Sequence, residues 1–174
     1  MKLVALIAAG ILAVTCILYI VSNALPSWGQ ISFGGFSSSY GLWKSCRSTP
    51  VETECFSIKC PIKDDESGLC GRILAGRAFM TLACILSGIT TISLLLCAFT
   101  DVGKNRILLL ITKALAFGCL IMGIIGVAVG GSSLQKVPNE GDFKYKLGTA
   151  AIIGIITIII NLVGAVASVF IKQS

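Results

Sequence analysis

The sequence contains no histidine and little charge of either sign. Histidine is the commonest general base and the commonest metal ligand, so its absence removes the usual basis for acid–base catalysis and for a metal centre. Charged residues make up 13% of the 174 residues and hydrophobic residues 55%, whereas soluble domains carry about 25% charged residues. The chain therefore has too little polar surface to cover a water-soluble globule.

The sequence lacks the usual features of enzymes, of nucleic-acid-binding proteins and of autonomous transporters. No carboxylate lies inside the long apolar stretches, and no serine or cysteine nucleophile has an obvious base, so we expect no enzyme activity and no cofactor. The formal net charge is +6, but the basic residues are scattered and form no stripe that would bind nucleic acid. The apolar stretches also lack the paired charges that transport paths need.

Four stretches are apolar and long enough to cross a membrane, which takes about 20 residues. They cover residues 3–21, 78–100, 107–130 and 147–171, and Lys113 is the single charged residue among them. In hydrocarbon each must be a helix, because every backbone group needs an internal partner. The first stretch could instead be a cleaved signal peptide, but its apolar run is long and the cleavage pattern after it is poor. We therefore expect one domain with four spans.

The connecting segments are a long loop over residues 22–77, a short turn over 101–106 and a second loop over 131–146. An even number of spans puts both chain ends on one side of the membrane. Lysines and arginines flank the spans almost evenly on the two sides, so the positive-inside rule does not decide the orientation. The cysteines decide it better.

Four of the eight cysteines lie in the long loop, at Cys46, Cys55, Cys60 and Cys70. An even number of cysteines in one loop indicates disulfides, which persist on the extracellular side. Zinc is the alternative, but it usually needs a close pair such as Cys-x-x-Cys, and eight, four and nine residues separate these cysteines. We expect the loop outside the cell and both termini in the cytoplasm of a plasma-membrane protein. The other four cysteines lie in the spans as small apolar residues.

Aromatic and β-forming residues in the long loop predict a small sheet. Residues 28–36 and 40–43 read as two strands joined by a turn, with Gly34-Gly35 and Ser37-Ser38-Ser39 as the separating residues. Residues 51–59 can supply a third strand. Residues 64–68, with two aspartates and a glutamate, read as a solvated turn.

The loop also carries a recognisable motif. The run Gly-Leu-Trp-Lys-Ser-Cys ends at Cys46, eight residues separate it from Cys55, and Trp28 precedes it. This resembles the claudin signature of a tryptophan, then Gly-Leu-Trp, then Cys-x(8–10)-Cys. Arg77-Ala78 and the segment 144–150 are similar to the claudin residues that open the second and fourth spans. The resemblance covers essentially the whole chain.

The resemblance implies a left-handed four-helix transmembrane bundle with a small extracellular antiparallel β-sheet. It implies a Cys46–Cys55 disulfide worth roughly 2–3 kcal/mol, and we expect a second disulfide between the additional cysteines 60 and 70. By resemblance, Trp28 and Trp43 would seat the sheet on the helix bundle, and Arg77 would hold the sheet through backbone carbonyls. The full set of signature residues is Trp28, Gly41, Leu42, Trp43 and Arg77.

The resemblance also implies a function and partners. A claudin-like protein would self-assemble in cis and in trans through its loops at cell junctions, giving adhesion and a paracellular barrier among membrane lipids. The alternative is an auxiliary subunit of an ion channel or receptor, as in the calcium-channel gamma subunits of the same superfamily. Residues 171–174 lack the hydrophobic end that many claudins insert into a PDZ domain, so we expect no PDZ scaffold through the C-terminus as written. The candidate interaction or selectivity residues are Lys44, Arg47, Glu52, Glu54 and Phe56.

Overall fold

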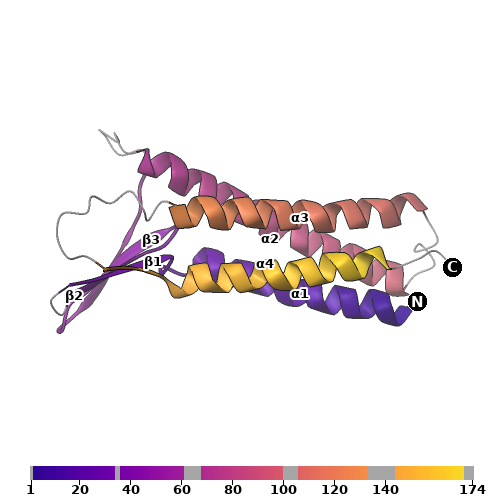
Figure 1. The fold of residues 1–174 in the computed structure, drawn as a ribbon, viewed down its shortest axis with the longest axis horizontal. Helices are drawn as coiled ribbons and strands as arrows, with labels where there is room; N and C mark the ends of the chain where they lie inside the picture. Colours follow the sequence, from indigo (N-terminus) through magenta and orange to yellow (C-terminus); the bar gives the residue numbers. More distant parts are fainter. Residues whose placement is uncertain (1, 34–35, 61–67, 100–105, 133–143, 171–174) are drawn as a thin grey trace.

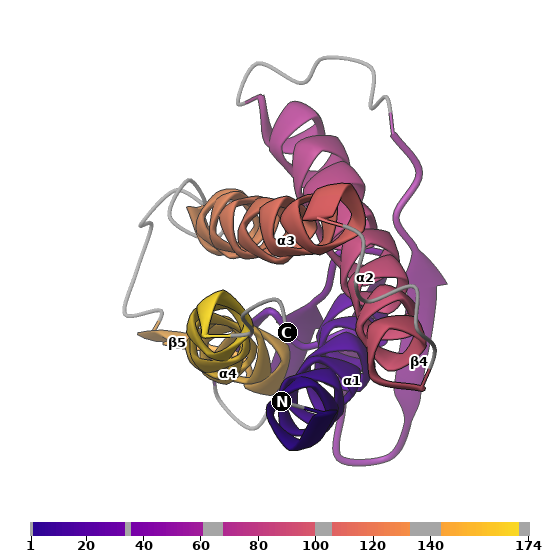
Figure 2. The same ribbon diagram turned by 90° about the vertical axis from the view of Figure 1, so that its right-hand side faces the viewer.

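The computed structural model describes residues 2–33, 36–60, 68–99, 106–132 and 144–170 (Figure 1). In these residues four helices pack lengthwise into a bundle, with bounds α1 Lys2–Ala24, α2 Leu69–Phe99, α3 Arg106–Ser132 and α4 Thr149–Val169. A β-sheet projects from one end of the bundle, and α1 begins and α4 ends at the other (Figure 1). Viewed along the bundle, α1 lies between α2 and α4, and α3 closes the ring (Figure 2).

The helices form because their sequences are long, apolar and free of proline. Between 28% and 39% of the most apolar window of each is buried within the protein, so most of each surface remains apolar and outward-facing. Threonine hydroxyls inside the helices donate to the carbonyl four residues earlier, which satisfies them without a partner helix; these are Thr15, Thr90, Thr91, Thr112 and Thr157. Lys113, the one charge in the third predicted span, donates from Nζ to the Val169 carbonyl at the end of α4.

The five strands pair in the order β4-β3-β2-β1-β5, and every pair is antiparallel. Their bounds are β1 Gly29–Phe33, β2 Phe36–Tyr40, β3 Lys44–Ser48, β4 Thr53–Ser57 and β5 Lys144–Leu147. Strand β5 directly precedes α4 and pairs with β1, which closely follows α1. The two strands are more than a hundred residues apart in sequence, so the sheet joins the beginning of the chain to its end.

The structure corrects two of the predicted strands. Ser37, Ser38 and Ser39 form the middle of β2 rather than a turn, because their backbones pair with β1 on one side and β3 on the other. Residues 41–43, predicted as strand, form the bend between β2 and β3. The third predicted strand, residues 51–59, contains β4.

Two predicted boundaries also change. Helix α2 begins at Leu69, inside the segment predicted as loop, because Arg72 and Arg77 interrupt the apolar pattern without interrupting the helix. Residue 147, predicted to open the fourth span, ends β5 instead. Several predicted segments lie outside the described residues: the Gly-Gly turn at 34–35, the turn at 64–68 except for its last residue, residues 101–105, most of the second loop and residues 171–174.

Glycines of α3 let the neighbouring helices and the sheet pack closely. A side-chain carbon built on Gly126 would lie 2.8 Å from Met80 of α2, and one on Gly130 would lie 2.7 Å from the Trp28 ring. The Gly-x-x-x-Gly pattern of α3 therefore serves contacts within this chain.

Candidate interaction surface

Trp28 is the central anchor between the sheet and the bundle. Its side chain is 2% exposed, and its indole N–H donates to the Ser22 carbonyl at 2.9 Å. Its backbone N–H donates to the Tyr40 carbonyl of β2, and its own carbonyl accepts from Gly148 at the start of α4. One residue thus ties α1, the sheet and α4 together.

The Gly41-Leu42 pair of the motif fits the bend against the bundle. A side-chain carbon on Gly41 would lie 2.7 Å from the Leu25 carbonyl oxygen and 2.5 Å from Pro26 Cα, so only glycine fits without a shift of the backbone. Leu42 is 2% exposed and packs in the same apolar cluster as Trp28. The bend is therefore seated directly on the helices.

Arg77 and Trp43 clamp the sheet to α2. The Arg77 guanidinium donates from Nε to the Leu42 carbonyl at 2.6 Å and from Nη2 to the Ile58 carbonyl at 3.0 Å. It also lies 4.9 Å from the centre of the Trp43 ring, a cation–π distance. The Trp43 indole N–H in turn donates to Asn23 Oδ1 of α1 at 2.9 Å. The arginine therefore holds the chain on both sides of strands β3 and β4.

Two disulfides close the described part of the loop. Cys46 of β3 and Cys55 of β4 are directly opposite in register, and they are bonded across the two strands. Cys60 is bonded to Cys70 in the first turn of α2, which fixes the chain after β4 to the helix. Among the described residues, no group of three or more cysteine, aspartate or glutamate side chains is placed to hold a metal ion.

One face of the sheet carries apolar and aromatic side chains outward, and we call it the aromatic face. Ile31, Ser38, Arg47 and Glu54 lie opposite one another in neighbouring strands, so they form one row across this face. Because side chains alternate along a strand, residues two positions away share the face; these are Phe36 and Tyr40 of β2 and Phe56 of β4. Phe36 is 56%, Tyr40 40% and Phe56 60% exposed.

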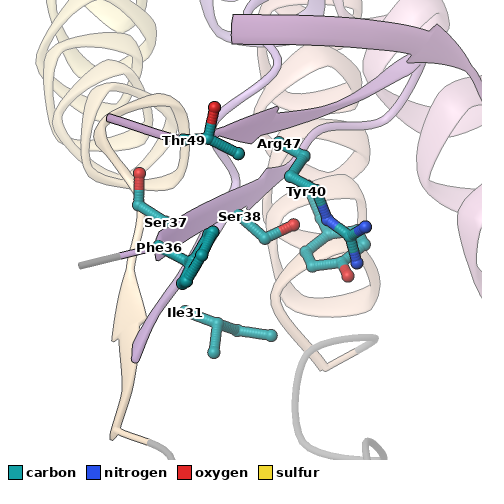
Figure 3. Close-up of a pocket in the computed structure, with 7 residues that line it drawn as sticks. All are labelled: Ile31, Phe36, Ser37, Ser38, Tyr40, Arg47 and Thr49. Atoms are coloured by element: carbon teal, nitrogen blue, oxygen red, sulfur yellow. The ribbon is translucent and has the colours of Figure 1, made fainter. Parts of the chain in front are cut away.

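A hollow of about 470 Å³ lies over this face. Figure 3 shows the side chains that line it, with Ile31 and Phe36 as its apolar part and Arg47 beside Tyr40. Ser37, Ser38 and Thr49 complete the lining. The hollow thus combines apolar, hydroxyl and cationic side chains in one place.

The candidate interaction residues predicted from the sequence divide between three places. Arg47, Glu54 and Phe56 lie on the aromatic face, whereas Lys44 lies on the opposite face of β3. Glu52 lies in the β3–β4 turn, where its backbone N–H donates to the Thr49 hydroxyl. Sequence reasoning missed the contribution of three further residues: Ile31, Phe36 and Tyr40. Period-two alternation could have grouped Phe36 with Tyr40 once β2 was recognised, whereas Ile31 joins them only through the pairing of β1 with β2.

A family model matches residues 2–167, which is nearly the whole chain, and its description is the PMP-22/EMP/MP20/Claudin family. The chain belongs to this family. No curated protein sequence matches the chain significantly. The match and the four apolar helices identify a claudin-like multi-pass membrane protein with a small antiparallel sheet. In this member of the PMP-22/EMP/MP20/Claudin family, the motif residues lie at the junction of sheet and bundle, and the aromatic face lies beyond it.

Proposed function

We propose that the chain is a claudin-like cell-junction protein that self-assembles through its sheet for cell–cell adhesion and a paracellular barrier. In this proposal the sheet lies outside the cell and both termini lie in the cytoplasm. The observation that carries it is the aromatic face, where Phe36 and Phe56 are more than half exposed on a sheet fixed to the bundle. Exposed aromatic side chains on a rigid support are the usual anchors of protein interfaces.

The free edge of the sheet offers a second means of association. Among the strands of the described residues, β4 is the last on its side, and all five of its residues are exposed. An edge strand presents N–H and C=O groups to which another strand can add. Val51, next to β4, is 95% exposed and adds apolar surface at the same edge. Neighbouring copies would therefore meet through β4 and the aromatic face.

The charges on the aromatic face favour a barrier over an ion-selective pore. Arg47 and Glu54 occupy directly opposite positions in β3 and β4. One charge of each sign at neighbouring positions produces no strong field of a single sign that would select cations or anions. Phe56, the residue after the disulfide cysteine of β4, adds no charge.

The test is assembly in cells that lack junction strands. Freeze-fracture electron microscopy of the wild type should show continuous intramembrane strands at cell contacts, and transepithelial resistance should rise. The Phe36→Ser/Phe56→Ser double variant should reach the surface but form few strands. Phe99→Ser is the matched control, because Phe99 is 72% exposed at the far end of α2 and should leave strands intact.

Surface-located wild-type protein that forms no strands would contradict the proposal. The same cells then serve the alternative, an auxiliary subunit of a channel or receptor, which predicts that a channel or receptor chain co-purifies with this one. The outward apolar faces of the four helices of this chain leave room for such a partner within the membrane.

A further inference from the structure

A groove lies between α1 and α2 at the base of the sheet, and the aromatic face has no part in it. We infer that this groove binds one membrane phospholipid, with the phosphate on Lys44 and an acyl chain along the two helices. The groove has a volume of about 550 Å³, and residues of α1, α2 and the start of β3 line it. It is independent of self-assembly, so either proposal can fail without the other.

The lining changes from apolar to polar toward the sheet. Ile20 of α1 and Cys84 of α2 lie about one helical turn farther from the sheet than Ala24 and Thr81 do, because α1 runs toward the sheet and α2 runs away from it. Ile20 is 53% exposed, so this deeper part opens outward among the apolar side chains that face the membrane. It suits a hydrocarbon chain.

The end of the groove near the sheet carries polar groups. Lys44, Asn23 and Thr81 lie there together with the Trp43 ring. Thr81 is exposed on its helix and accepts from Asn23 Nδ2 at 3.4 Å. Tryptophan is typical of the level at which lipid headgroups meet hydrocarbon. A polar end above an apolar slot has the order of groups found in one lipid molecule.

The wall formed by Trp43 is held in place without a ligand. Its N–H bonds to Asn23, and the Arg77 guanidinium covers its ring. Because the Trp43 side chain is already ordered, binding a ligand against it does not require the free energy that ordering the side chain would cost. Arg77 is already engaged with two carbonyls, so the cation that the groove lining offers to a ligand is Lys44. An ammonium group beside an acyl slot favours a phosphate ester over a sterol hydroxyl.

The experiment is native mass spectrometry of the full chain released from nanodiscs of phosphatidylcholine, phosphatidylserine and cholesterol. The wild type should retain one phospholipid after bulk lipid is stripped. Lys44→Gln and Ala24→Phe, which remove the cation and fill the groove, should each lower that retained fraction about fivefold. Lys59→Gln and Ala128→Phe are matched controls, an exposed lysine and an exposed helix alanine outside the groove, and should retain the lipid.

Tryptophan fluorescence gives a second readout in intact vesicles. The chain has two tryptophans; Trp28 is 2% exposed, and Trp43, in the groove, is 44% exposed. Brominated phosphatidylcholine should quench Trp43 in the wild type, and Lys44→Gln should weaken this quenching. Retention of cholesterol in place of phospholipid, absence of a bound lipid, or equal retention in the groove variants and their controls would overturn the inference. Lys44→Gln changes an exposed side chain, so its result stands even where Ala24→Phe disturbs the fold.

Discussion

Removing the Arg77 guanidinium should loosen the sheet from the bundle. In Arg77→Met the apolar stem remains, but the two hydrogen bonds to the Leu42 and Ile58 carbonyls and the contact with the Trp43 ring are lost. Hydrogen bonds to a charged group contribute about 1.5–3 kcal/mol each. Because Arg77 is only partly buried, we take the lower end for each, and the free energy of unfolding should fall by about 3 kcal/mol.

The assay is SDS-induced unfolding from mild-detergent micelles, followed by tryptophan fluorescence, because both tryptophans lie where the sheet meets the helices. Arg77→Lys keeps the charge but lacks the planar fork that reaches two carbonyls, so it should recover about half of the loss. Arg72→Met is the control. Arg72 makes one such bond, from Nη1 to the Ser132 carbonyl at 3.2 Å, so by the same reasoning the loss should be about 1.5 kcal/mol. If Arg77→Met and Arg72→Met unfold at the same SDS fraction, Arg77 does not hold the sheet on the bundle.

Three further changes test other parts of the junction and bundle. Gly148→Ala should abolish surface expression in a biotinylation assay, since the new methyl group collides with the backbone before β1, whereas Gly10→Ala meets nothing and should be expressed normally. Cys46→Ser/Cys55→Ser should lower the free energy of unfolding in SDS by roughly 2–3 kcal/mol, and an unchanged midpoint would contradict this. Asn161→Leu should cost about 1 kcal/mol in the same assay, because the buried Asn161 amide donates to a tyrosine and a cysteine of other helices.

The sequence predicts the helices because membrane spanning leaves a strong and simple pattern. The beginning of α2 escapes that pattern, since Arg72 and Gly76 look like loop residues while the helix continues outside the apolar window. Local propensity also misplaces β2. Serine favours turns, but the pairing of Ser38 with strands on both sides outweighs that preference.

The anchors, the aromatic face and the groove are each formed by residues that lie far apart in the sequence, so they are harder to predict from it. The motif identifies the anchors Trp28 and Trp43 through a family resemblance, while their partners become visible in the structure alone. The aromatic face requires the register of three strands, and the groove requires α1, α2 and the start of β3 to meet. Alternation along β3 places Lys44 and Arg47, three residues apart, on opposite faces of the sheet, but it does not show which of the two lies at the groove.

The passage from the sheet into α4 is a single residue, Gly148, between β5 and the helix. On the other side, four residues separate the end of α1 from β1. Because these connections are short, a rotation of either helix must also rotate the strand attached to it. A bilayer thinner than the helices makes them tilt, and any tilt of α4 against α1 must turn the paired strands β5 and β1 with it. We therefore expect the orientation of the sheet to change with the thickness of the surrounding membrane.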